Sequence, residues 1–180
     1  MDLMKLLTSA GADAGLQKIA AELGLASADA GKLIEALEPA MKGGLQKQAA
    51  TAEGLAGLKR ALETGQHDRY LKNPELLGKA ETREDGNRIL GHLFGSKDVS
   101  RQVAAKAAEQ TGFDTSLIKK ALPLVASLTM GAMGRTTDEK AGAGSAGGLS
   151  ALTGILGGLD SDGDGKASLG DVVGLARKFF

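Results

Sequence analysis

The spacing of apolar residues predicts helices along most of the chain. Leucine, isoleucine, valine and alanine recur three and four positions apart, which places them on one face of a helix. The predicted helices run over 12–23, from Ser27 through Met41, from Leu55 to near Gly65, over 85–94, from Ser96 or Asp98 to Thr111, and from Asp114 or Thr115 through Leu128. Pro39 either kinks the second helix or marks the start of a new one. The polar segment 66–79 is predicted to form a loop with short helical pieces.

Two parts of this pattern resemble each other. Leu23-Gly24-Leu25 is followed by Leu33-Ile34 and Pro39, and Thr111-Gly112-Phe113 is followed by Leu117-Ile118 and Pro123. The distance from Leu-Ile to proline is the same in both, whereas the stretch between glycine and Leu-Ile is four residues shorter in the second. An internal duplication is therefore predicted, with two related helical hairpins packed around one core. The expected fold class is an all-α bundle of short helices.

The composition changes near Gly131 to glycine, alanine, threonine and serine. The stretch 141–148 contains little apolar surface to offset the conformational entropy lost on ordering, so it is predicted to be a flexible linker. The expected organisation is a helical domain over 1–134, a Gly/Ala-rich linker over 135–148 and a C-terminal helix-loop-helix over 149–180. The last module alone is too small for a substantial core.

The segment 160–171 has the spacing of an EF-hand calcium loop. Positions 1, 3 and 5 of such a loop supply carboxylates, position 6 is a glycine, position 7 offers its carbonyl and position 12 completes the shell. Apolar residues at helical spacing flank the segment on both sides, as expected for helix-loop-helix. The candidate ligands of one Ca²⁺, with Mg²⁺ as a possible substitute, are Asp160, Asp162, Asp164, Lys166, Ser168 and Asp171.

The loop departs from the usual pattern at its last position. Asp171 stands where glutamate is usual, so its carboxylate is one methylene shorter and weaker coordination is expected. No second aspartate-rich loop is present to form a pair. The alternative is a turn in which Ser168 and Asp171 form a capping box. The loop and the helix after it resemble half of a dockerin repeat, in which aspartate at position 12 is common, but cohesin docking does not follow.

Composition narrows the function classes. Lys and Arg together number 22, as do Asp and Glu, so no net charge attracts nucleic acid or an anionic membrane. Cysteine is absent, which excludes disulfides, thiol nucleophiles and thiolate metal sites. No apolar run approaches the 18 or so residues of a membrane span. A soluble, cytoplasmic protein is expected.

The candidate catalytic groups are few. His67 next to Asp68, Arg69 and Tyr70 could form a general-base cluster, but adjacent residues do not face one another, so His67 is predicted to be a solvated loop residue. His92 lies in an apolar helix without a partner at i+4 and is predicted to pack in the core or at its boundary. A non-enzymatic protein is therefore expected.

Nucleic-acid binding is the alternative of a different class. The hairpins could resemble helix-turn-helix units, with a basic face formed by Lys59, Arg60, Arg69, Lys72, Arg83, Arg88, Lys97, Arg101 and Lys106. Acidic residues such as Glu63, Asp68 and Glu84 are interleaved with them, which is typical of a mixed, solvated surface. Steeply salt-dependent binding would favour this alternative.

Most of the chain resembles a known family. The duplicated hairpins, the segment 85–96 (DGNRILGHLFGS), the helix with Pro123, the glycine-rich linker and the LDSDGDG tail are together similar to the bacterial DUF937 family, related to YidB-like proteins. The resemblance implies an all-helical bacterial protein and supplies no catalytic residues. The expected function is calcium binding by an interaction or regulatory module, with a homodimer or an unidentified protein as partner.

Overall fold

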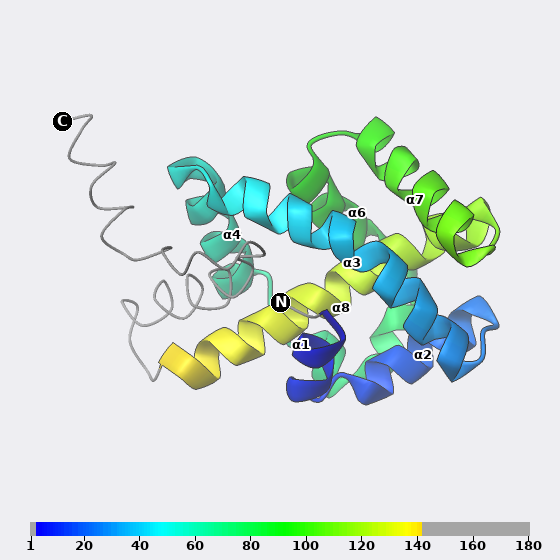
Figure 1. The fold of residues 1–180 in the computed structure, drawn as a ribbon. Coiled ribbons are helices and arrows are strands. Elements are labelled where there is room, and N and C mark those ends of the chain that lie inside the picture. The colour runs from blue at the N-terminus through cyan, green and yellow to red at the C-terminus, as the bar shows by residue number, and fades with distance from the viewer. Residues whose placement is uncertain (1–2, 142–180) are drawn as a thin grey trace.

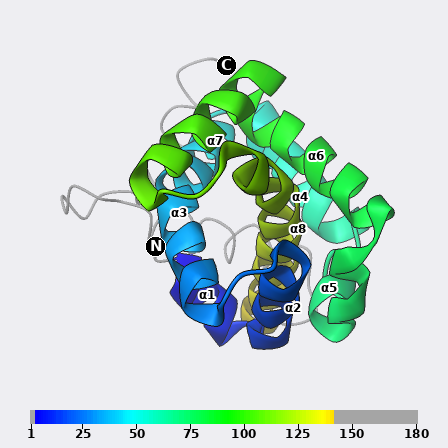
Figure 2. The same cartoon turned by 90° about the vertical axis from the view of Figure 1, so that its right-hand side faces the viewer.

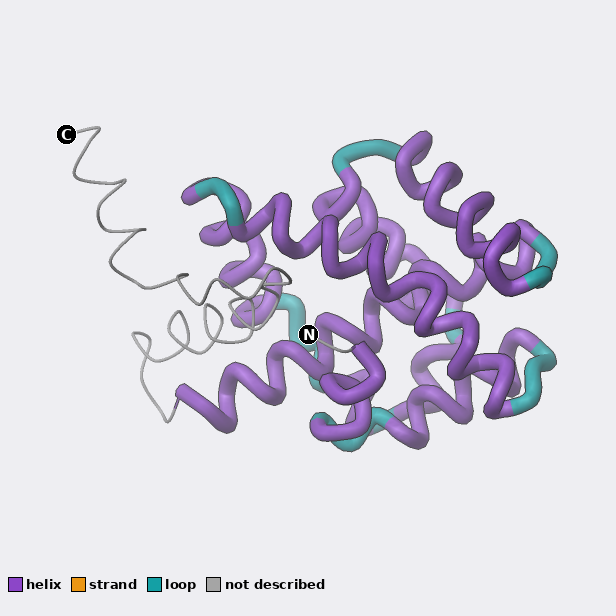
Figure 3. Tube along the Cα trace, viewed as in Figure 1, coloured by secondary structure: helices purple, strands orange, loops and turns teal. Residues whose placement is uncertain are grey.

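The computed structural model describes residues 3–141 and, within them, the side chains of 3–137. Every element in this range is helical, which confirms the predicted all-α fold (Figures 1 and 3). The elements are α1 (Leu3–Ser9), α2 (Asp13–Leu23), α3 (Ser27–Ala49), α4 (Ala52–Thr64), α5 (Arg69–Lys72), the 3₁₀ helix η1 (Pro74–Gly78), α6 (Ala80–Phe94), α7 (Lys97–Thr111) and α8 (Thr115–Ala141).

The centre of the fold is α8. Figure 2 shows it inside a ring of the other helices, and it contacts every other described α-helix. Residues 121–133 of α8 are all buried, so every side of this helix faces protein. The stretch (ALPLVASLTMGAM) carries no charged residue, as expected for a helix that is enclosed all round. The surrounding helices are amphipathic and turn their apolar faces towards it.

The predicted duplication extends to three helices in each half. α1, α2 and α3 are joined at Gly11 and Gly24, and α6, α7 and α8 are joined at Gly95 and Gly112. These four are the described glycines with positive φ, between 66° and 76°. Each follows the end of a helix, where the left-handed conformation is usual and costs glycine little. The two halves therefore share both of their turns.

The four-residue difference between the halves is compensated within each half. α7 has 15 residues and α2 has 11, a difference of about one helical turn. The part of α8 before Pro123 is shorter than the part of α3 before Pro39 by the same four residues, so glycine and proline are again 28 positions apart in each half (Gly11 to Pro39, Gly95 to Pro123). The contacts repeat as well, because α1, α2, α6 and α7 each touch both α3 and α8.

Prolines and glycines lie within the long helices. α3 is continuous through Pro39 and α8 through Pro123, so neither proline starts a new helix. Gly86 of α6 packs against Pro123, and a Cβ at position 86 would lie 2.0 Å from the Pro123 carbonyl oxygen. This close approach joins α6 to α8 more tightly than any larger side chain would allow.

Several helix ends differ from the predictions. α1 was not predicted, because Leu3 to Leu7 is short and interrupted by Lys5. No side chain caps α3, which begins at Ser27. Of the two predicted starts of α7, Ser96 is the capping residue, and it accepts a hydrogen bond from the Val99 amide at 3.3 Å. α6 begins at Ala80, five residues earlier than predicted.

The linker predicted over 135–148 begins within α8. The helix continues to Ala141, and the Thr136 and Thr137 hydroxyls donate to the carbonyls of Ala132 and Met133 inside it. The helical stretch 135–141 therefore belongs to α8, while 142–148 lies outside the described residues. None of the described helices combines the length and the hydropathy needed to cross a membrane.

Candidate functional site

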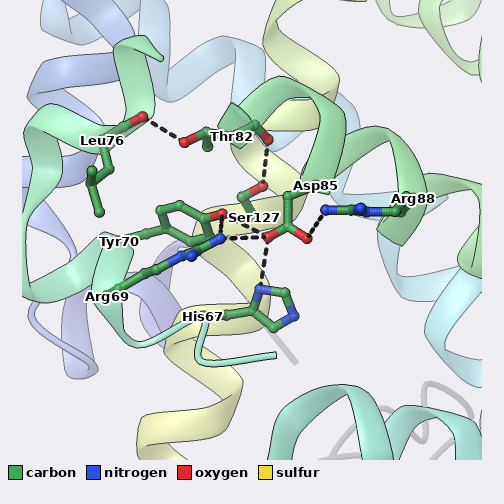
Figure 4. A network of polar contacts seen from close by, with 8 residues as sticks. All are labelled: His67, Arg69, Tyr70, Leu76, Thr82, Asp85, Arg88 and Ser127. Carbon is green, nitrogen blue, oxygen red and sulfur yellow. Dashed lines mark hydrogen bonds and ion pairs between the residues drawn. The ribbon is translucent and has the colours of Figure 1, made fainter. Parts of the chain in front are cut away.

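A polar cluster with a buried centre joins the segment after α4 to α6. It consists of His67, Arg69 and Tyr70 from the turn and α5, and Asp85 and Arg88 from α6 (Figure 4). The chain reaches it through a tight turn after α4, in which Gln66 has a φ of 47°. Gln66 is the one described non-glycine residue with a positive φ. The turn directs His67 and Tyr70 inwards.

Asp85 is the centre of the cluster. The Tyr70 hydroxyl donates to Asp85 Oδ2 at 2.6 Å and accepts from Arg69 Nη2 at 2.8 Å. Arg69 Nη2 lies 3.6 Å from the same carboxylate oxygen, and Arg88 Nη2 lies 3.4 Å from Oδ1. Burial would raise the pKa of Asp85, but the Tyr70 hydrogen bond and the neighbouring positive charges lower it, so Asp85 is ionised.

His67 is buried beside this carboxylate. Its side chain is 6% exposed, and Nδ1 lies 3.1 Å from Asp85 Oδ2. The two groups form an ion pair only if the ring is protonated, and Nδ1 is the one fully buried side-chain nitrogen or oxygen in the described part without a hydrogen-bond partner. Burial lowers the pKa of His67, although the charge of Asp85 acts in the opposite sense. At neutral pH the imidazole of His67 is therefore uncharged in the folded protein.

Both histidine predictions are wrong. His67 is buried instead of solvated, because its partner Asp85 is 18 positions away and the polar residues around it gave no sign of this contact. His92 is exposed instead of packed, because Leu93 and Phe94 occupy the inward side of the last turn of α6. A possible signal was Tyr70, the single tyrosine of the chain, placed in a polar segment.

A second set of hydrogen bonds extends the cluster towards α8. The Thr82 hydroxyl donates to the Leu76 carbonyl at 2.5 Å, and the Ser127 hydroxyl donates to the Thr82 carbonyl at 3.3 Å (Figure 4). Thr82 and Ser127 are both buried. These bonds tie η1 to α6 and α6 to α8. The arrangement holds three elements together.

The predicted metal ligands are not part of this cluster. Asp160, Asp162, Asp164, Lys166, Ser168 and Asp171 all lie outside the described residues. Among residues 3–137, no three side chains of His, Asp or Glu converge in a way that could hold a metal ion. The calcium site therefore stays a prediction from the loop sequence.

Replacing Tyr70 by phenylalanine is expected to lower the free energy of unfolding by about 2 kcal/mol, because a buried hydrogen bond to a charged group is lost. The measurement is urea denaturation followed by far-UV circular dichroism. Asp85→Asn and the double variant complete a thermodynamic cycle, in which a coupling energy of about 1 kcal/mol or more is expected for groups in direct contact. Additive effects of the two substitutions would contradict this account of the cluster.

Comparison with known protein families gave a match over most of the chain. A family model described as a bacterial protein of unknown function, DUF937, matches residues 5–136. The matched range covers most of the chain and runs from within α1 to within α8, the first and last helices of the two halves. No curated protein matched the chain, and no solved structure did.

Proposed function

The chain belongs to DUF937, a family of bacterial proteins of unknown function, and we propose that it is a non-enzymatic protein that binds one calcium ion through residues 160–171. The observation that carries this proposal is the spacing of oxygen donors in that segment. Aspartates occupy positions 1, 3 and 5, glycine occupies position 6, and aspartate occupies position 12. A turn that served only to connect two helices would need none of this order.

The donors suit a hard divalent cation. Four aspartates carry the negative charge, and Lys166 contributes its carbonyl at position 7 while its side chain offsets one charge. Ser168, at position 9, is placed to bind directly or through water. Ca²⁺ accepts irregular shells of six to eight oxygens, whereas Mg²⁺ requires a near-ideal octahedron, so the segment favours calcium. The short carboxylate of Asp171 points to a weaker site than one closed by glutamate.

The role that follows is an interaction or regulatory one. Leucine and isoleucine recur before the loop, and valine, leucine and phenylalanine recur after it, so each flanking helix would have an apolar face. A single hand of about 30 residues cannot bury both faces within itself. These faces would be covered by the helical domain, by a second copy of the chain or by another protein, and calcium would alter that contact.

Nucleic-acid binding gains no support from the described surface. Of the basic residues that could form a binding face, five lie in ion pairs with nearby acids, namely Lys59, Arg69, Lys72, Arg88 and Arg101. Arg101, for example, lies 2.8 Å from Asp98 one turn away on α7. Such pairing divides the surface into small patches of mixed charge, which attract a phosphate backbone weakly.

Calorimetric titration of the chelator-stripped protein with calcium is expected to give one saturable site. The variant Asp160→Ala/Asp162→Ala is expected to abolish the heat, because it removes two of the three carboxylates at the start of the loop. Magnesium is expected to bind more weakly. Asp98→Ala, on the exposed first turn of α7, is the matched control and should bind calcium as the parent does.

The absence of heat at millimolar calcium, together with unchanged amide signals of Gly163 and Gly165, would reduce the loop to a capped turn.

If calcium binds, sedimentation with calcium and with chelator tests the regulatory role separately. A calcium-dependent change in mass would indicate pairing of two copies. Binding without any change in mass or in protease sensitivity of residues 149–180 would leave a metal site with no regulatory effect.

A further inference from the structure

The segment 65–79 is held against the rest of the fold at His67. The His67 backbone lies directly on α8, where a Cβ at Gly131 would be 2.6 Å from the His67 carbonyl oxygen. The imidazole lies over Gly65, where a Cβ would be 2.1 Å from Nε2. Asp85 of α6 faces Nδ1 at 3.1 Å. One ionisable ring therefore lies at the meeting point of α4, α6 and α8.

We propose that His67 and Asp85 form a pH-sensitive latch, in which protonation of His67 releases the segment 65–79 from α6 and α8 while the rest of the fold stays intact. The proposal rests on the buried cluster itself. It is independent of calcium binding, since all the groups involved lie within residues 65–131.

The charges around His67 decide that protonation opens the latch instead of tightening it. Asp85 already has a hydrogen bond from Tyr70 and two guanidinium groups within 3.6 Å. Burial of the ring is the main cause that lowers the pKa of His67 and disfavours its protonated form. The charge of Asp85 favours that form, but this carboxylate is already compensated by the hydrogen bond and the two guanidinium groups, and Arg69 repels a protonated ring. The protonated ring must also leave water, which costs several kcal/mol for an ion of this kind. Release into solvent relieves both penalties.

Within the described residues, the other acids near the ring are already paired or lie beside another cation. The charge of the adjacent Asp68 favours the protonated ring, but Asp68 is engaged by Lys72, and the enclosed part of α8 (121–133) contains no charged residue. On α2, Lys18 pairs with Glu22 and with Glu75 of η1, while Lys59 and Glu63 of α4 pair with each other. Glu81 of α6 acts on Arg69. The acids that surround the segment are thus already engaged or lie beside another cation.

The pH range follows from the sign of the shift. The pKa of His67 is lowered in the folded state from the ordinary value of 6.5. The closed form is therefore fully stable above pH 6.5 and loses stability as the pH falls from that value towards the folded pKa. Asp85, whose pKa is lowered from 3.8, stays ionised through this range. The contacts of Asp85 are lost in a separate and lower pH range, in which Asp85 itself becomes protonated.

Opening would uncover an apolar surface. Tyr70 and Leu77 of the segment are 1% and 0% exposed. Leu77 and Leu128 of α8 both lie close to Gly15 of α2. A Cβ on Gly15 would be 2.7 Å from Leu128 Cδ1 and 3.4 Å from Leu77 Cδ1. Release of the segment would expose these groups on α2 and α8, so a protein that is closed at neutral pH would gain a binding surface at acidic pH.

The chain provides its own reporter for this opening. It has one tyrosine and no tryptophan, so its intrinsic fluorescence arises from Tyr70 alone. A phenol bonded to a carboxylate emits weakly, and its emission rises when that bond breaks. Between about pH 8 and about pH 5, we expect the emission of the full chain to rise, with a midpoint below 6.5, while the far-UV circular dichroism keeps most of its helical signal.

Variants of the two histidines identify which of them causes the transition. His67→Gln is expected to abolish it, and His92→Gln, which removes the exposed second histidine, is expected to leave it unchanged. Because His67→Gln could also unfold the protein, the unmodified chain is followed by amide NMR over the same range. Signals of 65–79 should shift or broaden while those of α3 stay in place. A constant emission, a transition retained in His67→Gln, or simultaneous loss of signals from the whole domain would overturn the latch.

Discussion

Replacing Gly86 by alanine is expected to lower the free energy of unfolding by about 3 kcal/mol. The added methyl carbon would lie 2.0 Å from the Pro123 carbonyl oxygen and 2.5 Å from its carbonyl carbon, both of which belong to the backbone of α8. No side-chain rotation relieves such a clash, so α6 and α8 must separate. Their separation would loosen packing along the most extensive helix contact of the fold.

Gly91 of the same helix provides a matched control. It is exposed, and a Cβ there meets nothing within 4 Å. Gly91→Ala is therefore expected to stabilise the protein by about 0.5 to 1 kcal/mol, through the better helix propensity of alanine. Urea denaturation of the two variants side by side gives the comparison. Equal effects of the same sign would show that helix propensity, and not the contact with Pro123, decides the outcome at position 86.

Ile34→Ala and Ile118→Ala are each expected to cost about 3 kcal/mol, with similar values for the two. The two isoleucines follow leucine at the same distance from proline in the two halves, and their exposed fractions are 1% and 0%. Removing either side chain leaves a cavity in the core between the halves. Because the positions are equivalent in the three-helix repeat, the surroundings should relax to a similar extent.

The control for these variants is Val99→Ala. Val99 is the most exposed large apolar residue described, at 39%, and its truncation is expected to change stability by no more than about 0.5 kcal/mol. The midpoint and the slope of the denaturant unfolding curve are measured for every variant and compared. A difference of more than about 2 kcal/mol between the two isoleucine variants would argue against equivalent packing in the two halves.

Local patterns in the sequence were sufficient to predict much of the fold. Gly24 and Gly95 follow apolar stripes that end one residue before them, and both glycines, like Gly112 after α7, are left-handed residues after a helix. The repeat of Leu-Ile and proline predicted the paired hairpins, because Leu33, Ile34 and Ile118 lie in the core and Leu117 packs against it. These features depend on neighbours within a few turns, which a single sequence displays directly.

The features that were missed depend on distant contacts. α1 is a helix of seven residues, shorter than periodicity can detect, and it is supported by α3 and α8. The inward turn of His67 is set by Asp85 and by the close approach at Gly131, neither of which is near it in sequence. The prediction of a calcium site, by contrast, rests on residues 160–171 alone and awaits titration.

The burial of α8 on all sides has a consequence for synthesis. Of the described helices α8 is the last to be translated, yet all the other α-helices pack against it. A nascent chain that ends before α8 would carry seven α-helical segments with apolar faces and no surface to cover them. Domains fold as units once their core residues are available. Folding of this domain is therefore expected to wait until Met133 has left the ribosome, and chaperones would have to protect the chain until then.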